Sequence, residues 1–200
     1  MKKLKTKKHI MLDLETLSLK DNPVVLSISA VCFDIDADNK REDFIRPSSG
    51  IFDDKVFNVA LEIDSQIKKG LSLDSETLKF HLLHNEAFFK ECIGASKGIP
   101  IIDTSHTLNR FHYWYTKKIS RDQDTPIVWA NGAIADFTWL RSLYTTYGME
   151  FPISYKNQLC LRTIISSYES KRERFNNHDS FDDCVDQILT IQELYKIASV

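Results

Sequence analysis

The chain has 200 residues, of which 42% are hydrophobic, and this is enough to bury the core of one ordinary domain. A formal net charge of −2 excludes a generally basic nucleic-acid coat, and no apolar run approaches the roughly 18 residues needed to span a membrane. The four cysteines lack C-x-x-C spacing, so neither a zinc site nor a disulfide framework is expected, and a reducing cytoplasm is the simplest compartment.

A lysine-rich tail, residues 1–8, precedes the first predicted strand. It carries five lysines and is expected to be a solvated, frayed terminus, with contact to phosphates as the alternative. The acids in the segment that follows exclude the apolar core of a signal peptide.

The first predicted strand contains a pair of acids. The run IMLDLET, residues 10–16, is apolar with strand character, and residues two apart in a strand share a face, so Asp13 and Glu15 should point the same way. Two carboxylates that close repel each other unless a divalent cation neutralises them, and their hard oxygens suit Mg²⁺ or Mn²⁺. The alternative is a strand that ends in an exposed acidic turn.

Two more strands and a helical insertion are predicted before residue 100. The segment 24–33 is apolar enough for a central strand, and 43–46 is predicted as the next strand. Residues from about 50 to 100 are predicted to form an insertion with short helices. Helical spacing of apolar residues predicts helices over 75–83, 85–92 and 104–118.

A second acidic position follows in the middle of the chain. Residues 126–130 predict a buried strand, and Asn131-Gly132 predicts a tight turn that leads into a helix over 134–147. Asp136 falls about one turn into that helix among apolar neighbours. A solvated helix acid is the alternative to a buried, functional one.

The order of the predicted elements indicates an α/β fold. A short strand near 159–161 and a helix near 163–168 precede a last helix that begins near residue 180. Strands first, followed by alternating strand and helix units, suit a mixed sheet.

The third acidic cluster lies at the start of the last predicted helix. Ser180, followed three residues later by Asp183, resembles a capping arrangement, which places Asp183 in the first turn. His178 lies in the preceding loop, from which its imidazole could reach the same site. The alternatives are a surface histidine and a first-turn acid favoured by the helix dipole.

The three clusters together resemble a known family. D-x-E near the N-terminus, N-G-x-x-x-D in the middle and H-D-x-x-D-D before the last helix resemble the motifs of the DEDDh group of 3′-to-5′ exonucleases, over about residues 9–187. The resemblance implies a single exonuclease domain over 1–200, with a ribonuclease H-like mixed β-sheet flanked by helices and carrying a helical insertion.

The resemblance also implies the roles of the site residues. By matching position, Asp13, Glu15, Asp136 and Asp183 would hold two divalent metal ions, Mg²⁺ or Mn²⁺, and His178 would act as the general base. The reaction would be phosphodiester hydrolysis that releases nucleoside 5′-monophosphates from a 3′ end.

A narrower resemblance is to the phage exonuclease A branch and its bacterial relatives. It is carried by LSISAVCFDID, VWANGAIADFTWLRSLY and CLRTI. This chain departs from that branch at a common tryptophan pair, where it has Phe80 and His81, at an aromatic position occupied by Ala135, and at an acid replaced by Cys160.

The narrower resemblance implies a 3′-to-5′ exodeoxyribonuclease that acts on single-stranded DNA in a bacterial or phage-infected cytoplasm. An exoribonuclease or oligoribonuclease is the first alternative, because nothing in the sequence shows whether a 2′-hydroxyl is accepted. A non-catalytic nucleic-acid-binding or interaction domain is the second.

Substrate contacts are predicted around the acids. In the family, positions matching Thr16 and Leu17 touch the terminal sugar and base, and their alternatives are a turn residue and a core leucine. Phe80 and His81 could stack a base, although Phe80 suits a helix core equally well. The predicted substrate set is completed by Asn131, at the tight turn, and by Arg162, which would hold an acid of the site or a phosphate. A surface ion pair is the alternative for Arg162.

Overall fold

The computed structural model describes residues 8–47, 51–119, 125–168 and 178–198. Of the predicted lysine-rich tail, residues 1–7 lie outside the described residues. None of the described helices is both long and apolar enough to cross a membrane.

Six strands of the described chain form one mixed sheet in the order β4-β3-β2-β1-β5-β6. The central strand β1 runs antiparallel to β2 and parallel to β5. Strands β2 and β3 are antiparallel, while β3 pairs with β4 and β5 with β6 in parallel. The strands are β1 (His9–Thr16), β2 (Val25–Phe33), β3 (Val56–Leu61), β4 (Ile101–Ile102), β5 (Ile127–Ala130) and β6 (Gln158–Cys160).

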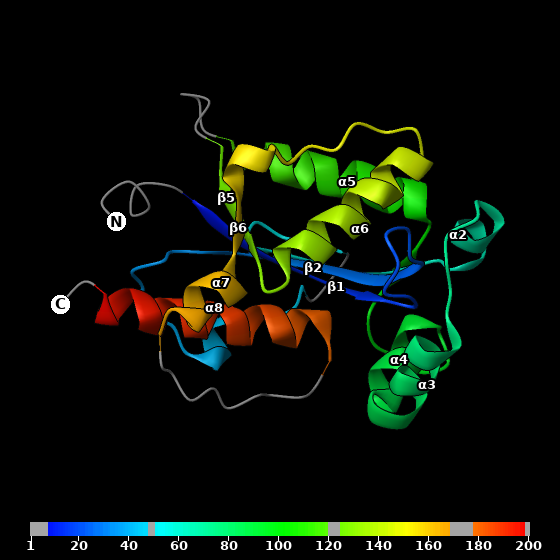
Figure 1. Ribbon diagram of the computed structural model, residues 1–200, viewed down its shortest axis with the longest axis horizontal. Helices are drawn as coiled ribbons and strands as arrows, with labels where there is room; N and C mark the ends of the chain where they lie inside the picture. Colours follow the sequence, from blue (N-terminus) through cyan, green and yellow to red (C-terminus); the bar gives the residue numbers. More distant parts are fainter. Residues whose placement is uncertain (1–7, 48–50, 120–124, 169–177, 199–200) are drawn as a thin grey trace.

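Helices cover both faces of the sheet (Figure 1). Helices α5 (Thr104–Thr116) and α6 (Ala133–Thr146) cover one face, and α7 (Leu161–Ser166) and α8 (Ser180–Ile197) cover the other. The prediction of a mixed sheet flanked by helices is therefore confirmed.

Alternation along β1 decides which face the acids share. Ile10, Leu12 and Leu14 pack into the core beneath α5 and α6, whereas Met11 packs into the core beneath α7 and α8. Residues two apart lie on one side of a strand, so Asp13 and Glu15 continue the Met11 row. Both acids therefore lie on the α8 side of the sheet.

A helical insertion lies at one end of the sheet (Figure 1). It contains α2 (Asp64–Lys68), α3 (Ser75–His84) and α4 (Glu86–Cys92). Phe88 and Phe89 of α4 are buried in the larger hydrophobic core, so the insertion is packed against the sheet.

The prediction of a strand over 43–46 was wrong. Segment 43–46 begins with the last residue of a 3-10 turn, η1 (Arg41–Asp43), and continues without regular structure. The third strand is β3, inside the segment predicted to be a helical insertion. Every residue of β3 is buried and its main chain pairs with β2, whereas 43–46 is partly exposed. Burial on both faces gives β3 no polar alternation, which is why its sequence pattern was ambiguous.

The other predicted elements are confirmed with small shifts at their ends. Strands occur near 10–16, 24–33, 126–130 and 159–161, and helices near 75–83, 85–92, 104–118, 134–147, 163–168 and from residue 180. A second 3-10 turn, η2 (Tyr155–Asn157), leads into β6.

Candidate active site

Two of the acids lie at the end of β1 next to buried hydroxyl groups of β2. Asp13 is opposite Ser29, and Glu15 is opposite Ser27. Asp13 is 9% exposed, and the Glu15 side chain is 13% exposed. An extended strand in the centre of the sheet therefore fixes both carboxylates.

The first turn of α8 is attached to β2, the strand next to β1. Ser180 Oγ lies 2.9 Å from Ser27 Oγ and 2.7 Å from Ser29 Oγ, and Ser29 Oγ donates to Asn58 Oδ1 at 2.8 Å. These buried hydroxyl groups fix the start of α8 above β2. Asp183, one turn further along, is thereby directed toward the acids of β1.

The cap of α8 differs from the prediction. Asp179, not Ser180, is the N-cap, and its carboxylate accepts from the main-chain N–H groups of Phe181 and Asp182. Arg46 Nη2 also donates to Asp179 Oδ2 at 2.6 Å. Ser180 cannot serve as the cap because its hydroxyl group is used against β2.

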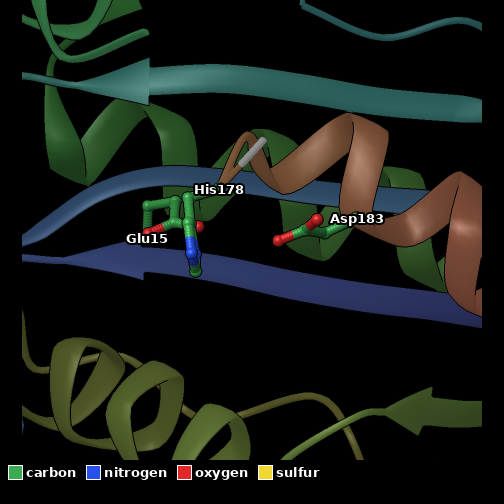
Figure 2. A group of neighbouring side chains, drawn as sticks. All are labelled: Glu15, His178 and Asp183. Carbon is green, nitrogen blue, oxygen red and sulfur yellow. The ribbon is translucent and has the colours of Figure 1, made fainter. Parts of the chain in front are cut away.

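Glu15, His178 and Asp183 meet at one point. A side-chain nitrogen of His178 and one carboxylate oxygen from each acid all lie within 4.8 Å of one another. Figure 2 shows the three side chains converging from β1 and from the start of α8. The sequence predicted this convergence from two segments more than 160 residues apart.

Asp136 approaches the same cluster from α6. It is 6% exposed and lies in the first turn, after the Asn131-Gly132 turn that follows β5. A Cβ added at Gly132 would lie 3.5 Å from Asp136 Oδ2 and 3.6 Å from Arg162 Nη2, so both side chains flank this turn. Asp136 is therefore a buried acid, not a solvated helix acid.

Neighbouring carboxylates raise the pKa of Asp13 and of Glu15. Burial is the largest cause at Asp13, followed by the charges of Asp136, Glu15 and Asp183, and together these hold its pKa well above the ordinary value. Burial and then Asp183 do the same to the pKa of Glu15.

Burial also raises the pKa of Asp136 to about 7 and that of Asp183 to about 7. Main-chain N–H groups and the Arg162 guanidinium partly oppose the shift at Asp136. A cluster of buried carboxyl oxygens that repel one another is stabilised when a divalent cation neutralises it. The donor set of Asp13, Glu15, Asp136 and Asp183 therefore fits divalent metal ions.

His178 is held in an unusual main-chain conformation. Its φ angle is +42°, in the left-handed region. Its ring meets the ring of Phe80 edge to face, with centroids 4.7 Å apart and an interplanar angle of 86°, and Asn85 Nδ2 donates to its carbonyl oxygen. Burial, and then His84, lower the pKa of His178, so the imidazole is neutral at pH 7 and can accept a proton.

Two predicted substrate residues are placed differently from the expectation. Leu17 is 2% exposed and belongs to the larger core, and His81 is 1% exposed. The His81 ring lies 5.8 Å from Phe89 at 17°, and its Nε2 lies 2.9 Å from the Thr16 carbonyl oxygen. These packing contacts leave neither side chain a face for a base, so the alternative reading of Leu17 as a core residue applies.

The other predicted substrate residues differ in how exposed their side chains are. Thr16 is buried, and its Oγ1 donates to the Ser18 carbonyl at 2.9 Å. Phe80 is half-buried beside His178, Asn131 is half-buried with an unpaired Oδ1 at the Gly132 turn, and Arg162 is exposed.

Sequence reasoning missed Gln187 as a member of the site. Its Nε2 donates to Asp13 Oδ1 at 2.8 Å, and both side chains are buried. A signal was present, because residues four apart on a helix share a face and Gln187 follows Asp183 by four positions. Asn85 gave no comparable signal, since its contact with His178 depends on how the insertion packs.

The fold and the cluster of acids define a class of ribonuclease H-like nucleases. The family described as the "3'-5' exoribonuclease Rv2179c-like domain" matches residues 8–195, and the chain belongs to this family. It therefore carries an exonuclease domain, and the prediction of an enzyme rather than a binding module is confirmed. No protein of curated function matches the chain in sequence.

Three solved structures share the fold at low sequence identity. Cell-death related nuclease 4 (CRN-4) has a TM-score of 0.63 and 15% identity, over 96% of this chain and 65% of that chain. The nuclease domain of 3'hExo, a DEDDh family member bound to rAMP, has a TM-score of 0.57 and 10% identity, over 95% and 92%. The RNase domain of the yeast Pop2 protein has a TM-score of 0.53 and 13% identity, over 96% and 78%. The ribonuclease H-like fold predicted from the sequence is therefore confirmed.

Proposed function

We propose that this domain is a metal-dependent 3′-to-5′ exoribonuclease that releases nucleoside 5′-monophosphates from single-stranded RNA. The observation that carries the proposal is the meeting of Glu15, His178 and Asp183 at the end of β1, with Asp136 near enough to Asp13 for its charge to raise the pKa of Asp13. The choice of RNA is supported by the family description and by two structural neighbours, one bound to rAMP and one described as an RNase domain.

The carboxylates would hold the metal ions. Asp13, Glu15, Asp136 and Asp183 offer hard oxygen ligands suited to Mg²⁺ or Mn²⁺. Such ions, when bound, lower the pKa of a water molecule and neutralise the developing charge on the leaving oxygen. The acids lie on β1, α6 and α8, so regular elements of the fold would orient the metal ligands.

His178 would take the proton from the attacking water. Its ring is neutral at pH 7, because burial and His84 lower its pKa, and its nitrogen lies close to Glu15 and Asp183. A neutral imidazole beside the attacking nucleophile is suited to general-base catalysis.

Arg162 would contact the substrate next to Asp136, because its guanidinium is exposed beside the Gly132 turn and suits a phosphate. Asn131 would border the substrate at the same turn with its half-buried side chain, whose unpaired Oδ1 is itself buried.

The experiment is product analysis on RNA and DNA oligomers of identical sequence. Each is 5′-labelled, with either a 3′-hydroxyl or a 3′-phosphate, and incubated with Mg²⁺ or Mn²⁺. We expect the 3′-hydroxyl RNA to be shortened stepwise from its 3′ end, faster than the DNA. The 3′-phosphate should resist, because its added charge would face Asp13 and Glu15.

Asp13→Asn protein, purified in parallel, controls for contaminating nucleases. DNA shortened at least as fast as RNA would favour the exodeoxyribonuclease that the narrower resemblance to the phage exonuclease A branch implies. Cuts within a circular single strand, or shortening from the 5′ end, would contradict the exonuclease reading.

A further inference from the structure

The helical insertion contacts the catalytic histidine at two points. Asn85, between α3 and α4, donates its side-chain amide to the carbonyl oxygen of His178. Phe80, on α3, places its ring against the His178 imidazole with centroids 4.7 Å apart. One contact therefore fixes the main chain of His178 and the other fixes its side chain.

His178 requires such support because of its main-chain conformation. A φ angle of +42° is disfavoured for a residue with a Cβ, and such conformations persist only where surrounding contacts hold them. A hydrogen bond to the carbonyl oxygen of this residue restrains the peptide that follows it, and thus the direction of the imidazole.

Asn85 is itself firmly anchored. It is 7% exposed, its N–H donates to the His81 carbonyl at 3.0 Å, and its carbonyl accepts from the Phe89 N–H at 3.0 Å. Both of its main-chain groups are thus used by the two helices. Only the side-chain amide remains to reach outside the insertion, and it reaches His178.

The insertion is in turn fixed to the strand that carries Asp13 and Glu15. His81 Nε2 donates to the Thr16 carbonyl at 2.9 Å, since a carbonyl oxygen can only accept. A continuous set of contacts therefore runs from β1 through His81 and Asn85 to His178.

We propose that Asn85 is a positioning residue that holds His178 over Glu15 and Asp183. The proposal rests on the proposed function, in which His178 is the general base. Among the described residues, the Asn85 side chain donates its hydrogen bond to His178, so Asn85 would act through His178. The insertion thus sets the geometry of proton transfer, while β1, α6 and α8 set that of metal binding.

The test is a double-mutant cycle measured on single-stranded RNA. In the otherwise unaltered protein, Asn85→Ala should lower kcat by about 10- to 100-fold with KM nearly unchanged, because a displaced catalytic group affects the chemical step. In the His178→Ala protein, the same change should have no further effect on kcat. Asn109→Ala, which removes another asparagine donor to a main-chain carbonyl, is the matched control and should leave kcat unchanged.

A second variant and a binding measurement separate positioning from general damage. Asn85→Asp keeps the side-chain size but turns a carboxylate oxygen toward the His178 carbonyl, so it should lower kcat at least as much as Asn85→Ala. Calorimetric Mn²⁺ binding should be unchanged in both variants.

Two results would refute the positioning role of Asn85, and a third would refute the assignment of His178 as the general base. Normal kcat in folded Asn85→Asp protein, or an Asn85→Ala loss that adds fully to that of His178→Ala, would show that Asn85 does not act through His178. A normal rate in His178→Ala itself would instead refute the assignment of the base in the proposed function.

Discussion

The carboxylates and the histidine of the site are held in different ways. Asp13 lies in a central strand, and Asp136 and Asp183 lie in the first turns of α6 and α8. His178 lies before α8 in a left-handed conformation and depends on Asn85 and Phe80.

The positions of the carboxylates and of the histidine therefore depend on different parts of the molecule. The elements that form the sheet and its helical layers fix the carboxylates, so their relative positions follow from folding itself. The histidine is fixed by contacts with an insertion outside the sheet. Substitutions of the carboxylates should therefore abolish activity, whereas substitutions of the histidine or its neighbours should lower the activity only partly.

The largest effect is expected at the acids. Asp13→Asn or Asp183→Asn should remove essentially all hydrolysis, because loss of bound metal removes both water activation and leaving-group stabilisation. Excess chelator should do the same to the unaltered protein. Asp64→Asn, at an exposed acid of α2, is the control for charge. Undiminished turnover in Asp13→Asn would refute the assignment of the carboxylates.

The next largest effect is expected at the histidine. His178→Ala should lower kcat by roughly 10²–10⁴-fold, the usual range for a positioned general base. Single-turnover kinetics on 3′-hydroxyl RNA measures this loss without interference from product release. His106→Ala, on the exposed side of α5, is the control. A normal rate in His178→Ala would make the histidine a bystander.

A smaller effect is expected at Gln187. Gln187→Leu removes the donor to Asp13 Oδ1 and should weaken Mn²⁺ binding or lower kcat by about 10-fold, as for other groups that orient a metal ligand. Gln192→Leu is a matched change on the same helix, where the amide donates to Asp34 and Asn39 instead. Equal losses in both variants would indicate general damage to α8.

The smallest effect is on stability and has a defined pH dependence. The pKa of Asp136 is raised from 3.8 to about 7, so between about pH 4 and 7 the folded state binds more protons at this group than the unfolded state. Its contribution to stability is present below pH 4 and is lost as pH rises through 7.

Asp136→Asn should therefore raise the free energy of unfolding at pH 8 by up to about 4 kcal/mol in the presence of chelator, and by about half of that at pH 5. Urea denaturation at the two pH values measures the difference. Destabilisation at pH 8 would show that the buried carboxylate is stabilised by contacts that outweigh its burial.

The sequence predicted the acids of the site because charged residues in apolar runs are unusual. Asp13 and Glu15 interrupt a buried strand, and Asp183 lies in the first turn of an amphipathic helix, so each was recognisable from its local pattern. Their convergence was implied by the resemblance of the three motifs to those of the DEDDh exonucleases. The regular elements around them were predicted for the same reason, since their apolar spacing is local.

The supporting contacts could not be predicted because they join distant segments. Gln187 and Asp13 are 174 residues apart, and Asn85 and His178 are 93 apart. Whether His81 faces a base or the core depends on how α3 docks, which its spacing does not specify. Strand β3 was missed because full burial removes the alternation that identifies a strand.

The most direct test of the account is whether metal binding and proton transfer belong to different side chains. Calorimetric titration of Mn²⁺ into the unaltered protein, Asp183→Asn and His178→Ala measures this. We predict that His178→Ala binds Mn²⁺ like the unaltered protein, whereas Asp183→Asn loses binding. Because His178 lies within 4.8 Å of the Glu15 and Asp183 oxygens, a histidine ligand is geometrically feasible. Loss of Mn²⁺ binding in His178→Ala would therefore contradict the separation of roles and make the histidine a metal ligand.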